Sequence, residues 1–167
     1  MPELVFASAN LNKIKEIKSL LPDNWNIISA LEAGISEDIP ETGNTLNENA
    51  FLKANYIFQK THKDCFADDT GLEVEALDNA PGVYSARFAG PEKNDQKNIQ
   101  FLLEKLNHKS SRKARFRTVL CLCLKGEFFY FEGIAEGEIA MNPIGNQGFG
   151  YDPVFIPQGY DQTFAQM

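Results

Sequence analysis

The apolar residues of this chain recur in two patterns, one typical of strands and the other typical of helices. Short continuous apolar runs in the first half predict buried strands at residues 3–7, 24–30 and 64–68. Between and after these runs, spacings of three and four residues predict three helices with these apolar positions: Ile14, Ile17 and Leu21; Leu46, Ala50, Ala54 and Ile57; Ile99, Leu102, Leu103 and Leu106. Thr45 and Glu48 form the T-x-x-E pattern of a capping box, which marks the start of the second helix.

The second half of the chain is dominated by strand and turn patterns. "ARFRTVLCLCL" and "EFFYFEG", joined by Lys125 and Gly126, predict a hairpin, and "IAEGEIA" (134–140) predicts a further strand. Residues 78–92 are too rich in Pro and Gly for a regular element, and residues 142–157 are a glycine-rich loop that runs into a short strand. Strands alternate with helices early and a hairpin follows late, so we expect an α/β fold with a mixed central sheet flanked by helices.

Length and composition predict one soluble domain spanning residues 1–167. The 23 acidic and 16 basic side chains give a net charge of −7, which argues against a nucleic-acid or membrane-surface partner. "MPELVFASANLNK" has no secretory signal pattern, and no stretch approaches the roughly 18 apolar residues of a membrane span. We therefore expect a cytoplasmic protein without membrane contacts.

The three cysteines are expected to be buried and reduced. Cys121 and Cys123 share one face of the same strand, while Cys65 lies in another apolar run. Two thiolates without partner His or Cys residues make a poor zinc site, and the chain has only two histidines.

"SANLNK" (8–13) joins a predicted strand to a predicted helix and is suited to bind phosphate. Backbone N–H groups at the helix start, the Ser8 hydroxyl, the Asn10 amide and the Lys13 ammonium would all donate to phosphate oxygens. The pattern differs from a P-loop. The alternative is that Asn10 or Asn12 only caps the helix and that Lys13 is solvated.

Asp68, Asp69, Thr70 and Gly71 follow a buried strand and predict a turn. Consecutive strand residues point to opposite faces, so only a turn would bring both carboxylates to one point. There they could hold Mg²⁺ together with waters and substrate phosphates. A solvated turn is the competing interpretation.

Two further groups carry weaker signals. Glu41 lies in a loop before the capped helix and Lys53 lies beside its apolar stripe, so both could face a site, although each residue type is more often a plain surface charge. In "GNQGFGYDP" (145–153), Phe149 and Tyr151 could offer aromatic faces to a base and Asp152 an acceptor; a glycine-rich turn with core aromatics is the alternative.

Taken together, the motifs resemble those of the inosine triphosphate pyrophosphatase family. "SANLNK", "ETGNTLNENAFLKA", "FADDTGLEV", "APGVYSARFAG" and "GFGYDPVF" occur in that family's order and spacing over essentially the whole chain. The resemblance implies two lobes around a deep nucleotide cleft and a homodimer. It also implies Mg²⁺-dependent hydrolysis of the purine nucleoside triphosphates ITP, dITP and XTP to the monophosphate and pyrophosphate, which cleanses the nucleotide pool.

The resemblance also implies roles for individual residues. Asp69 would be the catalytic carboxylate and a Mg²⁺ ligand, Glu41 a second ligand, and Asp68 and Lys53 would support the reaction. The residues implied to bind substrate are Ser8, Ala9, Asn10, Leu11, Asn12, Lys13, Thr70, Phe149, Gly150, Tyr151 and Asp152. "YSAR" belongs to the family pattern, but it gives Arg87 no role.

The sequence departs from the family pattern after "DQTFAQM". There the family continues with a lysine, a Ser-His-Arg segment and a C-terminal helix, so the resemblance implies that a C-terminal segment is missing. Two rival functions stay open: a Maf-type pyrophosphatase of other specificity, and a catalytically silent nucleotide-binding module. The carboxylates at 41, 68 and 69 argue against the silent module.

Overall fold

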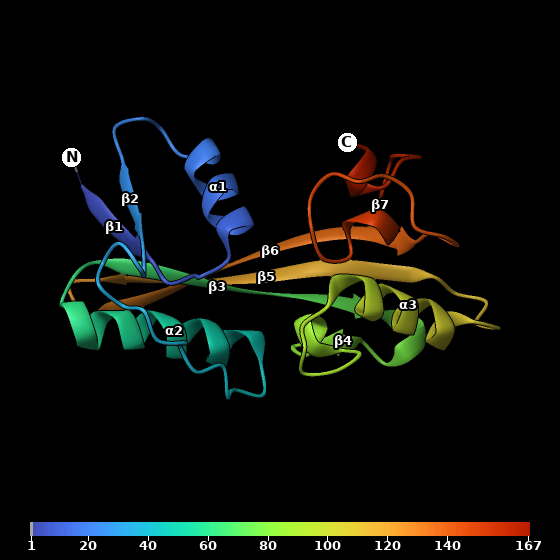
Figure 1. Ribbon diagram of the computed structural model, residues 1–167, viewed down its shortest axis with the longest axis horizontal. Helices are drawn as coiled ribbons and strands as arrows, with labels where there is room; N and C mark the ends of the chain where they lie inside the picture. Colours follow the sequence, from blue (N-terminus) through green and yellow to red (C-terminus); the bar gives the residue numbers. More distant parts are fainter. Residues whose placement is uncertain (1) are drawn as a thin grey trace. The chain divides into compact units, whose positions relative to one another are not determined.

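Figure 1 shows the computed structural model, which describes residues 2–167. The mixed α/β fold is confirmed: seven strands form one sheet in the order β2-β1-β3-β5-β6-β7, with β4 paired to β3. The helices and strands are β1 (Glu3–Phe6), α1 (Leu11–Leu20), β2 (Asn26–Ser29), α2 (Leu46–Thr61), β3 (Cys65–Val74), β4 (Ala80–Gly82), α3 (Asp95–Leu106), β5 (Lys113–Leu124), β6 (Glu127–Ile139) and β7 (Phe155–Pro157). Single 3₁₀ turns lie at Glu75–Leu77, Ser85–Arg87, Asp152–Val154 and Phe164–Gln166.

The chain folds into two compact units. Unit 1 is the chain up to Asp69 together with Val119–Glu132, and unit 2 is Thr70–Thr118 together with Gly133–Met167. Strands β3, β5 and β6 contribute residues to both units. The nucleotide cleft implied by the family resemblance stays a prediction.

Unit 1 is built on parallel strand pairing. β1 pairs with β2 and with β3, and Val5 and Phe6 lie opposite Cys65 and Phe66. Parallel strands with both faces covered are apolar throughout, which explains why "ELVFA" lacks alternation. In Figure 1, α1 lies on one side of β3 and α2 on the other. The core beneath α1 consists of Leu4, Phe6, Ile14, Ile27 and Phe66, flanked by Ile17, Leu21, Leu120 and Leu122.

Unit 2 has its own core, under α3. The apolar side of α3 packs on the second half of β3, on the start of β5 and on the end of β6. The buried members are Leu72, Val74, Ile99, Leu102, Leu106, Ala114, Ile139, Tyr151, Val154 and Phe155. β4 and β7 close this unit by antiparallel pairing with β3 and β6, respectively.

Two sequence-based expectations about strands are wrong. The expected turn at Asp68 to Gly71 does not exist, because β3 continues through these residues to Val74. The hairpin at Lys125 and Gly126 is confirmed, but the separate strand expected at 134–140 is part of β6, which runs without a break to Ile139. Tertiary pairing overrides the local preference of Asp and Gly for turns.

The start of α2 is confirmed, with one change in its cap. The Thr45 hydroxyl accepts a hydrogen bond from the Glu48 backbone N–H at 3.1 Å. The Glu48 carboxylate returns to the backbone N–H of Asn44, at 2.6 Å, rather than to that of Thr45. Side chains therefore accept hydrogen bonds from two backbone N–H groups at the N-terminus of α2. The T-x-x-E pattern predicts both bonds, although it places the second at Thr45 rather than at Asn44.

The cysteines are buried and free, as expected. Burial is the main cause that raises the pKa of the Cys121 thiol to about 11, so this thiol is protonated at neutral pH. Within residues 2–167, no helix combines the length and the apolar character needed to cross a membrane.

Candidate active site

The junction between β1 and α1 presents backbone N–H groups at a helix start. Asn10 is the N-cap residue of α1, and its side-chain oxygen accepts hydrogen bonds from the backbones of Asn12 and Lys13, at 3.0 and 3.3 Å. The Ser8 hydroxyl accepts from the Asn10 N–H at 3.1 Å. The capping interpretation of Asn10 is thus correct. It is compatible with anion binding, because the segment from Ala9 to Asn12 is exposed and the positive end of the helix dipole lies there.

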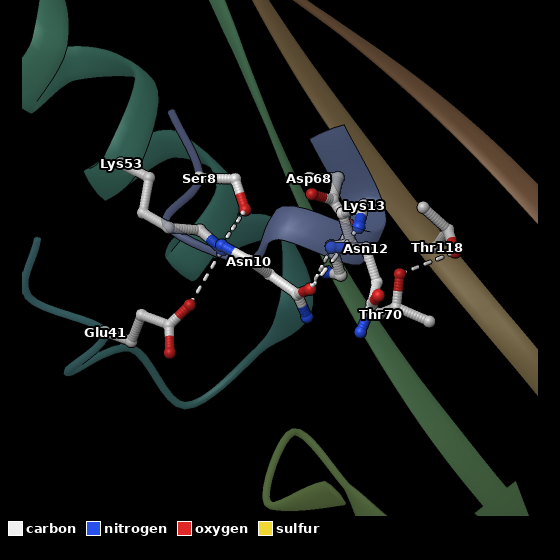
Figure 2. A network of polar contacts seen from close by, with 9 residues as sticks. All are labelled: Ser8, Asn10, Asn12, Lys13, Glu41, Lys53, Asp68, Thr70 and Thr118. Atoms are coloured by element: carbon white, nitrogen blue, oxygen red, sulfur yellow. Dashed lines mark hydrogen bonds and ion pairs between the residues drawn. The ribbon is translucent and has the colours of Figure 1, made fainter. Parts of the chain in front are cut away.

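Lys13 is turned toward β3 and is not a freely solvated charge. Its Nζ lies 2.6 Å from Asp68 Oδ2, and the two side chains are 23% and 12% exposed (Figure 2). This contact joins the first turn of α1 to the middle of β3. It holds a cation beside the exposed N–H groups of the helix start, where a phosphate group would add a second partner.

Asp69 belongs to the opposite face of the same strand. Because β3 is extended at this point, the side chains of Asp68 and Asp69 alternate between its two faces. Asp69 accordingly receives a hydrogen bond from Asn49 of α2 rather than from α1. Burial is the main cause that raises the pKa of its carboxyl group, and Glu41 acts in the same direction, whereas Lys53, Asn49 and Lys13 oppose the rise.

Glu41 and Lys53 form a second ion pair on the α2 face. Lys53 Nζ lies 2.7 Å from Glu41 Oε1, and the Lys53 side chain is only 9% exposed (Figure 2). Burial lowers the pKa of Lys53, but the charges of Glu41, Asp68 and Asp69 outweigh it, so the pKa is raised. Lys53 is therefore a permanent cation among three carboxylates at neutral pH.

Sequence reasoning missed Asn49. This residue is 1% exposed, and its Oδ1 accepts the backbone N–H of Gly43 at 2.8 Å. The signal was present in the helical spacing, because Leu46, Asn49, Lys53 and Ile57 share the buried side of α2. Two polar residues on an apolar stripe indicate a polar site under the helix.

The remaining predicted residues belong to unit 2. The Thr70 hydroxyl lies 2.8 Å from the Thr118 hydroxyl. Phe149 and Asp152 close a turn, in which the Phe149 N–H donates to Asp152 Oδ2 at 3.0 Å, and the Gly150 N–H donates to Asp95 Oδ2 at 2.8 Å. Tyr151 is a core residue, 5% exposed, and its hydroxyl donates to the Ser85 carbonyl. Their roles in substrate binding stay predictions.

The charge balance of unit 1 favours a cation. Three carboxylates (Glu41, Asp68 and Asp69) accompany two ammonium groups, so negative charge is in excess. Within residues 2–167, Asp69 Oδ2 is a buried oxygen with no hydrogen-bond partner. No group of three or more His, Cys, Asp or Glu side chains in the same range is placed to hold a metal ion alone. The arrangement suits a Mg²⁺ ion that takes one or two carboxylates and completes its shell with water and phosphate oxygens.

Comparison with known proteins covers nearly the whole chain. The model of the Ham1 family matches residues 4–167. A dITP/XTP pyrophosphatase from Flavobacterium psychrophilum is 57% identical over 165 residues, which are 99% of this chain and 87% of the relative. The solved structure of a HAM1 protein from Coxiella burnetii is 40% identical, with a TM-score of 0.91, over 100% of this chain and 87% of that one. The Ham1 protein of Staphylococcus aureus is 43% identical, with a TM-score of 0.87, over 99% and 86% of the two chains.

Proposed function

Because this chain belongs to the Ham1 family, we propose that it hydrolyses the non-standard purine nucleoside triphosphates ITP, dITP and XTP to the monophosphate and pyrophosphate. The observation that carries the proposal is the 57% identity, over 99% of the chain, to a protein named dITP/XTP pyrophosphatase. Further relatives at 54% and 50% identity have the same name. Neither alternative function is favoured, because these relatives share the name and match the chain almost throughout.

The side chains of unit 1 supply the groups that such a hydrolysis needs. The N–H groups at the start of α1 and the Lys13 ammonium would bind phosphate oxygens, which carry several negative charges. Asp69 is the candidate catalytic carboxylate: its buried Oδ2 accepts no hydrogen bond in residues 2–167, and its negative charge would help to orient the attacking water. Lys53 holds Glu41 in place through the 2.7 Å ion pair.

We also propose that Glu41 and Asp69 hold Mg²⁺ when substrate is bound. Excess negative charge and the buried Asp69 Oδ2 support this fit. The ion would polarise the phosphoryl group and offset its charge. Isothermal titration with Mn²⁺ tests the donor set directly: Glu41→Gln should weaken Mn²⁺ binding, whereas Glu37→Gln, a change in the same loop, should not. Equal affinities in the two variants would remove Glu41 from the metal site.

Product analysis tests the reaction itself. The purified chain is incubated with Mg²⁺ and dITP, XTP or dATP, and the products are separated by ion-exchange chromatography. We expect dIMP and XMP with one pyrophosphate each, and a lower kcat/KM for dATP. Release of orthophosphate would show cleavage at a different bond, and equal turnover of all three nucleotides would contradict the proposed substrate class.

Three further properties are proposed on the family resemblance and the net charge of −7. We propose that the protein is a homodimer, that it lies in the cytoplasm, and that it binds neither nucleic acid nor membranes. Light scattering coupled to gel filtration measures the first property, and a mass equal to the 18.7 kDa chain would contradict it.

A further inference from the structure

Asn49 is a buried polar residue of α2 that no part of the proposed reaction uses. It is 1% exposed, and a buried primary amide without partners would cost several kcal/mol. It is retained on the buried side of a helix, in line with Leu46, Lys53 and Ile57. The reason must therefore lie in the groups that its amide contacts.

One side of the amide holds the loop that carries Glu41. Asn49 Oδ1 accepts the N–H of Gly43 at 2.8 Å, and Gly43 is two residues from Glu41. A Cβ atom on Gly43 would lie 2.6 Å from the Cβ of Glu48 and 2.8 Å from Asn49 Oδ1. The absence of a side chain at position 43 thus permits the close approach of the loop to the amide.

The other side of the amide holds Asp69. The Asn49 side chain hydrogen-bonds the Asp69 carboxylate. Asp69 Oδ2 is buried and has no hydrogen-bond partner in residues 2–167. An ionised carboxylate only accepts hydrogen bonds, so the Asn49 amide meets Asp69 as a donor, through its NH₂ group.

We propose that Asn49 is a positioning residue, whose single amide ties the Glu41 loop and the Asp69 carboxylate into one arrangement. The inference rests on the proposed function, because it assigns Asn49 to the same hydrolysis. Its effect is geometric: the amide orients the carboxylate and does not touch the substrate.

Asn49→Asp separates the two contacts. The new carboxylate has nearly the same shape and still accepts the Gly43 N–H, but it offers Asp69 a negative charge in place of a donor. A donor to a charged carboxylate is replaced by a like charge, so we expect kcat to fall about 10-fold to 100-fold. Affinity for a non-hydrolysable α,β-methylene analogue of dITP should change by less than about threefold, because the phosphate-binding residues of α1 are untouched. Hydrogen exchange of the Gly43 amide should stay slow.

Thr45→Ala is the matched control. Thr45 caps the same helix four residues earlier, and its hydroxyl bonds the Glu48 backbone rather than Asp69. This variant should lower the melting temperature and leave kcat within about twofold of wild type. A kcat for Asn49→Asp within the same limits would overturn the proposal, as would an equal loss of kcat in Thr45→Ala.

An exchange of the two side chains covers the case in which Asn49→Asp is poorly folded. Combining Asn49→Asp with Asp69→Asn restores one donor and one carboxylate at the contact. The rise in melting temperature from Asn49→Asp to the double variant should exceed the rise that Asp69→Asn alone causes in the wild type, and additive changes would show that the two residues are not coupled. Wild-type protein without activity on dITP would contradict the proposed function instead, and the coupling in melting temperature would still report on the contact.

Discussion

At the scale of single residues, each of the two lysines of the candidate site, Lys13 and Lys53, is held by one carboxylate. Lys13 lies 2.6 Å from Asp68 and Lys53 lies 2.7 Å from Glu41, and all four side chains are at least partly buried. Removing one member of such a pair leaves the other charge poorly compensated, which costs more than the pair itself contributes. Substitutions at these positions therefore need controls that separate stability from activity.

Lys13→Ala should lower kcat/KM for dITP about 10-fold to 100-fold, because a charge-assisted contact to phosphate is lost. It should also lower the melting temperature, since Asp68 loses its ion pair. Lys15→Ala is the control: Lys15 is an exposed lysine on the same helix, and both quantities should stay close to wild type. A Lys13→Ala variant that loses stability but keeps its kcat/KM would show that Lys13 only supports the fold.

Asp69→Asn should reduce kcat about 10²-fold to 10³-fold, because an amide of the same shape supplies no negative charge to hold the ion or to orient the water. The same change should stabilise the protein at neutral pH. The folded-state pKa of Asp69 lies above the ordinary value of 3.8 because burial penalises the charged form, so ionisation favours the unfolded chain.

The sign of this effect can be checked with pH. Below 3.8 the Asp69 carboxyl is protonated in both states and contributes nothing; as pH rises through the folded-state pKa, its ionisation destabilises the wild type. Melting curves from pH 3 to pH 8 should therefore show Asp69→Asn above wild type at neutral pH, with the difference shrinking toward acid. A lower melting temperature at pH 7 would mean that the attraction between Asp69 and Lys53 dominates.

At the scale of elements, local patterns predicted the helices well and the strand ends poorly. The apolar spacing of α1, α2 and α3 depends on residues within the same helix, so it can be read from the sequence. The extent of β3 depends on distant partners: Leu72 pairs with Gly82, and this pairing extends the strand beyond Asp69. Local turn preference at Asp-Asp-Thr-Gly carries no information about that partner.

In the candidate site, too, the residue types could be predicted from local sequence, whereas their contacts with distant residues could not. Glu41, Lys53, Asp68 and Asp69 were proposed as site residues from the sequence, and the structure brings them together in unit 1; their catalytic roles stay predictions. The sequence could not show that Asp68 contacts α1 and Asp69 contacts α2, because this difference follows from the continuity of β3. Helical spacing could have placed Asn49 on the buried side of α2, but its contact with Asp69 could not be predicted, because Asp69 is distant in sequence.

The hairpin between β5 and β6 gives a prediction about an element. Lys125 and Gly126 both have positive φ, 51° and 85°, as the two central residues of a type I′ turn require. Gly126→Ala should cost about 1–2 kcal/mol of stability, because a left-handed conformation is unfavourable for alanine. Its Cβ would also lie 3.3 Å from Phe58. Lys125→Asn should raise the melting temperature, since asparagine is favoured at this position. Thermal melts should show a lower melting temperature for Gly126→Ala and a higher one for Lys125→Asn than for the wild type.

At the scale of the whole molecule, the boundary between the two units falls within strands rather than within loops. Independent domains are normally joined by exposed linkers, but here β3, β5 and β6 each supply residues to both units. A strand cannot lose half of its pairing without weakening the other half. The two units are therefore expected to unfold together.

Scanning calorimetry tests this expectation. Wild-type protein should show one transition, with a calorimetric enthalpy equal to the van't Hoff enthalpy. Gly126→Ala, which destabilises unit 1, should move the whole transition to lower temperature. A second peak that appears only in this variant would show that unit 2 melts separately.

The continuity of β3 also determines which kinds of genetic change the site tolerates. Asp68 contacts Lys13 and Asp69 contacts Asn49 because neighbouring strand residues face opposite ways. Inserting or deleting one residue between Cys65 and Asp68 would exchange these faces, so that one carboxylate would meet the wrong helix although every catalytic residue would still be encoded. Insertions of the same size in the exposed segment 107–110 would leave both contacts intact. Length variation among natural homologues should therefore be absent from β3 and concentrated in such loops.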